Sequence, residues 1–492
     1  MVARRWRGVV LFAVVLACAA LSPAMAAQKA SAKPPPKARP ATPLPWRAEG
    51  RPSYTLDAVA YPDSSGWQLT VSVRIPPDAV KFVADEDTAH AAQARLRLQL
   101  KLSNQYGAKL HESKQEFTME AKDSTASFGQ VVVTRFPVKP GRVQLWAKLQ
   151  DLKSRKRGIA YIGRKVNEEA QVEGGIDVPE EEAGLRVGNP EFLWITPAGG
   201  LDEMLPNPER LFGLFATTLH ARIHGEAPDD SLPWRWRARV VRAGQTVAEQ
   251  RDSTTAPSRA LDAIAGLDLS TLPAGGYDLE VQAWRVGGGA PVLRRGHFSI
   301  AWQLGAWRRS PRDVEDDVHL LLSEQEEDKF ADLEPGEQED YMEQFWKRRD
   351  QTTGTAANEW KATFEERVAF ANEHFGYKGM EKGMFTDMGR VYVRYGPPSD
   401  IQKEVIPAGD ETLVQVVQQI AATEDIPIGN LKVDAFGGDQ RPYEIWTYEN
   451  VVPIPIEVDP ERVSDLRRRE KVLFLFVDDQ GYGHFTLRYS TE

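Results

Sequence analysis

Arginines and carboxylates stand close together in the last third of the chain, and they are the residues best suited to chemistry. Residues 348–350 read Arg-Arg-Asp, Asp387 and Arg390 are three positions apart, and Glu444 follows later. Two carboxylates that face a cleft roughly 5 to 9.5 Å apart could act as acid and base on a glycosidic bond. The same groups could instead form arginine–carboxylate pairs that tie helices to a sheet, or a charged cleft that recognises a partner. If Asp387 proves to be buried against one of these arginines, the catalytic hypothesis weakens.

The sequence lacks the motifs of common enzyme classes and the residue patterns of metal sites. There is no Gly-x-Ser-x-Gly elbow, no phosphate-binding P-loop and no dinucleotide fingerprint. His220 and His224 lie in an alternating segment that predicts a strand, where they are too far apart to share a metal, and no HExxH motif accompanies them. The acidic stretch 315–340 lacks the alternating ligands of a calcium loop and is typical of solvated helix faces. We therefore expect no catalytic residues, no metal site and no cofactor.

Several short motifs in the last third follow one another in a recognisable order. They occupy residues 345–350, 354–355, 358–359, 367–375, 383–392, 395–398 and 442–446. In order and spacing they resemble the GWxTD-domain proteins, a family of exported bacterial proteins. The resemblance covers roughly residues 310 to 492, and it implies a compartment and an architecture but no reaction.

Two positions depart from the family pattern. Met384 stands where the family has the tryptophan that names it, and Thr353 stands where a proline is expected. Methionine fills apolar gaps, so a core role suits this position better than a ligand-stacking role. The candidate interaction or motif residues are Phe345, Trp346, Arg348, Arg349, Asp350, Asn358, Glu359, Arg367, Asn372, Gly383, Thr386, Asp387, Gly389, Arg390, Gly396, Pro397, Pro398, Tyr443, Glu444 and Trp446.

Three helices are predicted to position the first of these motifs. Ser323 and Glu326 form a capping box that begins a short acidic helix, which Pro335-Gly336 ends. A second helix runs through residues 341–346. A third begins near Ala356, and its apolar face carries Trp360, Phe364, Val368, Ala371 and Phe375.

Strands are predicted to follow these helices. They cover residues 390–395, 443–448, 472–477 and 483–489, with a hairpin turn at 478–481. Pro397 should end the first strand, because proline cannot donate a ladder hydrogen bond. Residues 401–440 form a long excursion with a helix that Asp410 could cap. This helix, carrying Leu413, Val416, Val417 and Ile420, could cover an open face of its own domain or dock a partner.

The middle of the chain predicts two β-rich units, at residues 50–170 and 185–303. Apolar residues alternate with polar ones, for example at Leu96, Leu98, Leu100 and Leu102. Both units have a Pro/Gly turn that feeds an alternating strand, at 140–147 and 273–281. This pattern resembles the late strand of immunoglobulin-like sandwiches, where a tyrosine often sits at the corner. An acidic linker is expected at 172–182.

The N-terminus predicts an export signal. Arg4, Arg5 and Arg7 precede an apolar run, and residues 24–26 form a small-residue cleavage site. Residues 1–26 should therefore be a signal peptide, and the Pro/Ala/Lys-rich residues 27–48 an extended linker. Cys18 is the only cysteine, and it leaves a lipid tether as a minority alternative. No transmembrane span is expected in the mature chain.

The sequence thus predicts a multidomain chain: two immunoglobulin-like β-sandwich modules followed by a C-terminal α+β domain, residues 310–492, with helices and then an antiparallel sheet. Its net charge of −10 disfavours nucleic-acid binding. We expect a periplasmic, cell-surface or secreted protein, a non-enzymatic scaffold or interaction protein whose last domain binds an envelope protein. The alternatives are an envelope-polymer hydrolase, or a carbohydrate-binding protein with exposed Trp234 and Trp236, which could equally pack in a core.

Overall fold

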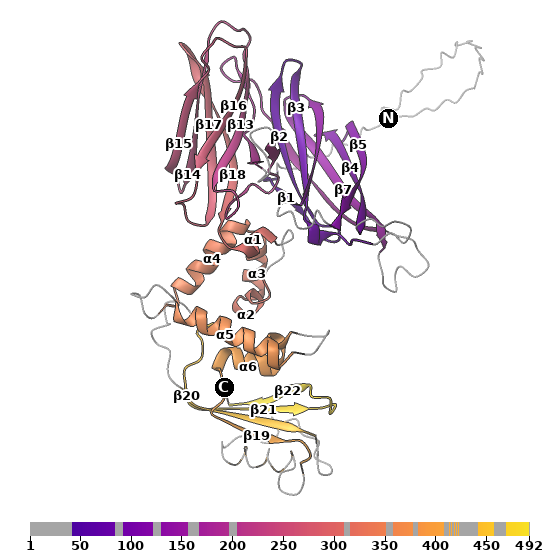
Figure 1. Ribbon diagram of the computed structural model, residues 1–492, viewed down its shortest axis with the longest axis vertical. Helices are drawn as coiled ribbons and strands as arrows, with labels where there is room; N and C mark the ends of the chain where they lie inside the picture. Colours follow the sequence, from indigo (N-terminus) through magenta and orange to yellow (C-terminus); the bar gives the residue numbers. More distant parts are fainter. Residues whose placement is uncertain are drawn as a thin grey trace, which may run out of the picture.

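The computed structural model describes residues 42–83, 92–121, 129–155, 167–195, 204–308, 315–350, 358–376, 382–407, 441–456 and 469–491, with residues 413, 415, 418, 420 and 422. The predicted signal peptide, Cys18 and most of the predicted linker lie outside these residues. Two β units lie side by side at one end of the molecule, and the helices join them to a last sheet at the other end (Figure 1). None of the described helices is both long enough and apolar enough to cross a membrane.

The first β unit consists of two antiparallel four-stranded sheets whose apolar faces share one core. One sheet has the order β1-β2-β3-β6, with β1 (Trp46–Ala48), β2 (Tyr54–Asp63), β3 (Gly66–Ile75) and β6 (Gln130–Val138). The other has the order β5-β4-β7-β8, with β4 (Gln93–Asn104), β5 (Lys109–Glu120), β7 (Gly141–Arg155) and β8 (Asn167–Val178). A short 3-10 helix, η1 (Pro77–Ala79), follows β3. The alternating leucines of β4 are all buried, as expected of a strand with one face in a core.

The second β unit has the same two-sheet construction. One sheet has the order β11-β10-β13-β16, with β9 paired to β13, and the other the order β12-β18-β17-β14-β15. The bounds are β9 (Arg186–Val187), β10 (Glu191–Ile195), β11 (Met204–Pro206), β12 (Leu211–Gly213), β13 (Thr218–Glu226), β14 (Trp234–Arg242), β15 (Gln245–Ser253), β16 (Ala260–Asp268), β17 (Gly275–Arg285) and β18 (Gly288–Ala301). All described pairings are antiparallel except β12 with β18. Tyr277 Oη donates a hydrogen bond to the carbonyl oxygen of Pro273 at 2.8 Å, at the corner where a tyrosine was expected.

The strands overrun the expected borders of these units. Strand β1 lies inside the segment expected to be an extended linker, and it pairs with β2. The expectation of a linker at 172–182 is wrong for its first half, because β8 continues to Val178 and pairs with β7 along its length. The acidic residues of this segment resemble those of a linker because Glu173 and Asp177 lie on the exposed face of β8, while Ile176 and Val178 are buried.

Short helices follow the second β unit. They are α1 (Leu304–Arg308), α2 (Val318–Leu321), α3 (Glu324–Ala331), α4 (Pro335–Lys347), α5 (Glu359–His374), a 3-10 turn η5 (Gly383–Phe385) and α6 (Asp387–Tyr395). The capping box of Ser323 and Glu326 begins α3, and Pro335 is the first residue of α4, both as predicted. Helix α5 starts three residues later than predicted, because Asn358 caps it by accepting a hydrogen bond from the amide of Lys361 at 2.9 Å.

The last sheet is antiparallel, with the order β19-β20-β21-β22. Its strands are β19 (Asp400–Glu404), β20 (Tyr443–Val451), β21 (Arg469–Asp478) and β22 (Phe485–Ser490). Helix α6 covers one face through Met388, Val391 and Tyr395. The described residues of 413–422 are helical, and Leu413 and Ile420 pack on the opposite face. Of the two roles considered for this helix, covering its own domain is therefore confirmed. Val416, Val417 and Asp410 lie outside the described residues.

The predicted strand at 390–395 is wrong, because these residues belong to helix α6. Thr386 caps the helix by accepting a hydrogen bond from the amide of Gly389 at 3.0 Å, and Asp387 lies in the first turn, where a negative charge is favourable. Gly396 ends the helix with a φ of 84°, a conformation that favours glycine. Pro397 and Pro398 therefore follow a helix rather than a strand.

A charged junction joins the two β units to the helices. Asp57 of β2 accepts two hydrogen bonds from Arg210 of the second unit, at 2.7 and 3.0 Å, and both side chains are buried. Arg47 of β1 pairs with Glu334 at the start of α4. Burial raises the pKa of Glu334, and the charge of Arg47 opposes this effect. The first β unit, the second β unit and the helices thus meet through paired charges.

His297 makes this junction sensitive to pH. Its Nε2 lies 3.7 Å from Glu337 of α4 and its Nδ1 3.2 Å from Asp278 of β17. The Glu337 carboxylate raises the pKa of His297 above the ordinary 6.5 against the opposing effect of burial, and Asp278 adds to the rise.

We predict that this stabilisation is complete below pH 6.5 and is lost as the pH rises through the raised pKa of His297, because the neutral ring no longer attracts the two carboxylates. The loss should stay below about 1 kcal/mol, since the ring is partly exposed. Denaturant titrations of the wild type and of His297→Gln on both sides of this pH range measure it. An equal pH response of both proteins would contradict the prediction.

Candidate functional site

Arg349 of the first motif ties the end of α4 to the segment that follows β20. Arg349 is buried: its Nε donates to the carbonyl of Pro455 at 2.9 Å, and its Nη1 to the carbonyl of Phe345 at 3.2 Å. Its guanidinium also lies 3.6 Å from the ring centroid of Phe345. Asn358 joins two helices, because its Nδ2 donates to the carbonyl of Trp346 at 2.7 Å while its Oδ1 caps α5.

The Gly-Met-Phe-Thr-Asp motif that corresponds to the family name forms a tight turn against α5. A Cβ atom on Gly383 would overlap the carbonyl oxygen of Ala371, and a Cβ atom on Gly389 would overlap that of Gly383. Asn372 Oδ1 accepts a hydrogen bond from the backbone amide of Met384 at 3.0 Å. Met384 is buried in the helical core, which confirms the core role that its methionine suggested.

Arg367 and Gly396 lie together at the end of α6. Arg367 Nη1 donates to the carbonyls of Val393 and Arg394, at 3.3 and 3.0 Å, and so satisfies the last turn of the helix. Burial lowers the pKa of Arg367. The carbonyl oxygen of Gly396 accepts a hydrogen bond from the hydroxyl of Tyr448 at 3.0 Å. This bond joins the end of the helix to β20.

Asp387 and Glu444, the two carboxylates considered as an acid and base, are both occupied elsewhere. Asp387 Oδ2 accepts a hydrogen bond from the backbone amide of Leu487 at 2.8 Å, and among the described residues the arginine pairing considered for Asp387 is not formed. Glu444 is buried, with Oε2 accepting from the indole of Trp446 at 3.0 Å and Oε1 lying 2.5 Å from Lys403 Nζ. In the sheet register, buried Phe476 lies between Glu444 and Leu487. Both carboxylates are therefore engaged by other groups, and a buried aromatic residue lies between the strand of Glu444 and the strand that Asp387 contacts.

The remaining predicted residues divide into buried and exposed groups. Phe345, Trp346 and Tyr443 are core residues. Arg348 is exposed and donates to the carbonyl of Gln344 at 3.2 Å, one turn back in its own helix. Other side chains at the surface are Glu359, Arg390 and Pro397, while Asp350 and Pro398 are half-buried. The structure does not gather these residues into one cleft.

A cavity lies instead between the helices, and we call it the helix pocket. It has a volume of about 450 Å³, within the range of small-ligand sites. Apolar side chains from α2 to α5 line part of it, namely Val318, Phe330, Met342, Trp346 and Phe364. The acidic residues that line it are Glu315, Asp317, Glu339, Glu343, Asp350 and Glu365, against the two lysines Lys347 and Lys361.

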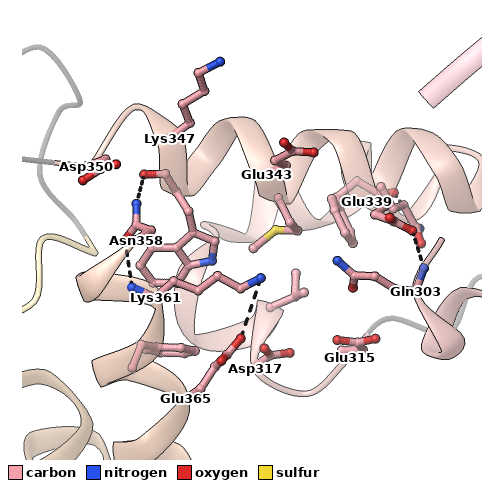
Figure 2. Close-up of a pocket in the computed structure, with 16 residues that line it drawn as sticks. Gln303, Glu315, Asp317, Glu339, Glu343, Lys347, Asp350, Asn358, Lys361 and Glu365 are labelled. Atoms are coloured by element: carbon pink, nitrogen blue, oxygen red, sulfur yellow. Dashed lines mark hydrogen bonds and ion pairs between the residues drawn. The ribbon is translucent and has the colours of Figure 1, made fainter. Parts of the chain in front are cut away.

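The charge of the helix pocket is negative and partly uncompensated. Figure 2 shows Glu339 and Glu343 on the α4 side, opposite Glu315, Asp317 and Glu365. Lys361 lies 3.7 Å from Glu365, and Lys347 points away from the cavity (Figure 2). Within the described part of the chain, Glu343 has no ion-pair partner.

Two further features concern the carboxylates of the pocket. Burial raises the pKa of Asp317, and the neighbouring charge of Glu315 raises it further. Glu339 holds the chain ahead of α1, because its Oε2 accepts the amides of Trp302 and Gln303 at 2.9 and 3.0 Å. An arrangement of carboxylates over aromatic and aliphatic side chains suits a cationic group with an apolar stem.

Comparison with protein-family models identifies the family of this region. The family model described as the GWxTD domain matches residues 308–407. The chain contains a GWxTD domain. The matched segment includes α2 to α6, most of the helix pocket and the Gly383–Gly389 contact, whereas Tyr443, Glu444 and Trp446 lie beyond it.

Other comparisons give no closer relationship. No curated protein sequence matches the chain. Solved structures with weak similarity include a red sea bream transglutaminase, at 9% identity and a TM-score of 0.16 over 50% of this chain and 31% of that one. A Parabacteroides merdae β-glucuronidase has 7% identity and a TM-score of 0.17 over 47% of this chain and 27% of the enzyme. This chain thus spans about a third of the length of such structures, and scores this low carry no argument about fold or activity.

The other residues considered for binding have structural places in the second β unit. Trp234 and Trp236 are buried in its core, so the exposed aromatic row that a carbohydrate-binding surface would need is not formed by them. His220 and His224 lie on strand β13, as predicted, and the ring of His224 stacks on that of Tyr61 with centroids 4.6 Å apart. Among the described residues, no group of three or more His, Cys, Asp or Glu side chains could hold a metal ion.

The helix pocket was missed by sequence reasoning. Its acidic residues come from six separate places between residues 315 and 365, and in the sequence they have the appearance of solvated helix faces. The one available signal was the mixture of these acids with buried aromatic residues such as Phe330 and Trp346 at helical spacing. Only the packing of α2, α3, α4 and α5 around a common space brings the two sets together.

Proposed function

We propose that this chain is an exported, non-enzymatic interaction protein of the cell envelope, whose GWxTD domain binds a basic segment of a partner protein in the helix pocket. The observation that carries the proposal is the pocket itself: an acidic lining over apolar side chains, with Glu343 lacking a cationic partner among the described residues. A lysine or arginine side chain from a partner would supply the missing charge and lay its methylene groups against Trp346 and Met342.

The placement of the motif residues supports binding over catalysis. Arg349, Arg367 and Asn358 are engaged with backbone groups, and Asp387 and Glu444 with an amide, an indole and a lysine. An acid–base mechanism needs a carboxyl group within reach of a substrate proton. The hydrolase alternative gains no support from a pair so engaged, whereas three other motif residues, Trp346, Asp350 and Asn358, line the helix pocket.

The remaining parts of the proposal concern compartment and spacing. The predicted signal peptide supports export to the periplasm, the cell surface or the medium. The two-sheet construction of both β units, and Tyr277 at the corner of the second, support the proposal that they are immunoglobulin-like modules. These modules would act as spacers or adhesion modules. The charged junction between β1, β2 and α4 would hold the GWxTD domain at a fixed position relative to them.

An oligoarginine peptide tests the pocket directly. We predict that the purified full chain binds it, and that Glu343→Lys weakens binding at least about tenfold, because like charges then face each other. Asp328→Lys is the matched control, since Asp328 is an exposed acid of α3 that does not line the pocket. Calorimetric titration at low and moderate salt measures both. Equal affinities for the two variants, or equal binding of an oligoglutamate peptide, would overturn the assignment.

A further inference from the structure

A second cavity lies between α2, α6 and strands β21 and β22 of the last sheet. It has a volume of about 390 Å³. Its apolar lining is formed by Leu320, Val391, Val393, Ile456, Phe474 and Leu487. Val393 and Phe474 are almost fully buried, so the inner wall is apolar and fixed by the core of the domain.

The permanently charged side chains of this cavity are two arginines. Arg390, Arg394 and His319 line it, and its lining contains no aspartate or glutamate. His319 Nδ1 lies 3.1 Å from Glu327 of α3, and Arg394 lies 5.6 Å from the ring centroid of Tyr395. The nearest acid on α6 is Asp387, one turn before Arg390, and its Oδ2 is engaged by the amide of Leu487.

Arg390 differs from the other arginines of the motif. Arg349 and Arg367 donate to carbonyl groups, and Arg348 to its own helix. The side chain of Arg390 is exposed, and in the described part of the chain no carboxylate pairs with it. Its guanidinium thus stands at the mouth of an apolar cavity with its donors available.

We propose that this second cavity binds an acyl chain that ends in a carboxylate, with the chain against the accessible apolar lining of Leu320, Ile456 and Leu487 and the carboxylate on Arg390. The charge of the mouth selects an anion, and a guanidinium fork matches a carboxylate in a bidentate manner. The apolar inner wall favours a hydrocarbon chain over a polar ligand, because transfer of apolar surface from water is favourable. This site does not depend on the helix pocket, and it takes a ligand of opposite charge.

The same anionic acyl chemistry could reach the cavity as a free fatty acid or as part of an anionic phospholipid. Dodecanoate below its micelle concentration is the probe for the first source, and vesicles of anionic phospholipid are the probe for the second. We commit to the free fatty acid, because a cavity of about 390 Å³ between α2, α6 and β22 has room for one chain rather than for a membrane surface.

Calorimetric titration of the purified full chain with dodecanoate tests the site. We expect dodecanoate to bind, and both dodecanol and dodecyltrimethylammonium to bind at least about tenfold more weakly, since neither offers a carboxylate to Arg390. Arg390→Ala should weaken dodecanoate by about tenfold and leave dodecanol unchanged. Arg348→Ala is the matched control, an exposed arginine of the same domain that lines neither cavity.

A second variant keeps the test independent of charge. Leu487→Trp would fill the mouth of the cavity while keeping the backbone amide that Asp387 accepts, so it should abolish dodecanoate binding in a folded protein. Failure of dodecanoate to bind the wild type, equal binding of dodecanol, or an unchanged affinity in Arg390→Ala would each overturn the proposal. Preferential binding of anionic vesicles, or of an apolar peptide with a free carboxyl terminus, would overturn it as well.

Discussion

Replacing Gly389 by alanine should destabilise the GWxTD domain by at least about 3 kcal/mol, one of the largest effects available to a single methyl group. The added Cβ would overlap the carbonyl oxygen of Gly383, and that residue is itself pressed against the carbonyl of Ala371. Backbone atoms border the site on both sides, so no side chain can move away to relieve the overlap. Chemical denaturation followed by tryptophan fluorescence measures the loss.

Gly288→Ala is the matched control for this prediction. Gly288 lies at the start of β18, and a Cβ atom there would meet no atom within 4 Å. Its substitution should change the free energy of unfolding by no more than about 0.5 kcal/mol. If Gly389→Ala were as stable as Gly288→Ala, the close packing of η5 on α5 and α6 would be refuted.

Replacing Arg210 by alanine should cost about 3–5 kcal/mol, because it leaves the carboxylate of Asp57 buried without its partner. Arg210 donates to both oxygens of Asp57 across the two β units, and its Nη1 also reaches the carbonyls of Leu44 and His297. The substitution therefore removes a contact between the units as well as a charge. Denaturation should show an earlier transition, and limited proteolysis should cut between the units.

The control for this second prediction is a pair with the same geometry in water. Arg142 and Asp177 form a bidentate pair at 2.7 and 2.9 Å on the exposed face of the first unit. Arg142→Ala should cost far less than Arg210→Ala, because solvent screens an exposed pair. Similar losses in the two variants would show that burial does not set the strength of the Asp57–Arg210 contact.

The sequence predicted the elements whose pattern is local. The period-two strands of both β units, the capping box at Ser323 and the last hairpin all follow from neighbouring residues, and the structure shows them. Residues 391–395 were predicted to form a strand, because Val-Tyr-Val-Arg-Tyr has the composition of a strand. The cap at Thr386 and the burial of Met388, Val391 and Tyr395 on one face make it a helix.

The two cavities could not be predicted for a different reason. Each is lined by residues from elements that are distant in sequence, such as Leu320 and Leu487 in the second cavity. A sequence pattern identifies which face of an element is apolar, but it does not say where several faces leave a space between them. For the same reason Arg349 and Arg390 looked alike in the sequence, although one is buried against carbonyl groups and the other is exposed at a cavity mouth.

Site-specific photo-crosslinking in intact cells tests the binding role of the GWxTD domain most directly. A photoreactive residue would replace Glu343 in the helix pocket, and in a second strain Asp328, which lies outside it. Our account predicts a protein adduct from position 343 alone, attached through a peptide rich in lysine or arginine, and its loss when Asp317→Lys is added. The account would be contradicted by equal adducts from both positions or by a crosslinked peptide rich in acidic residues. Evidence that the protein turns over a small molecule would also contradict it.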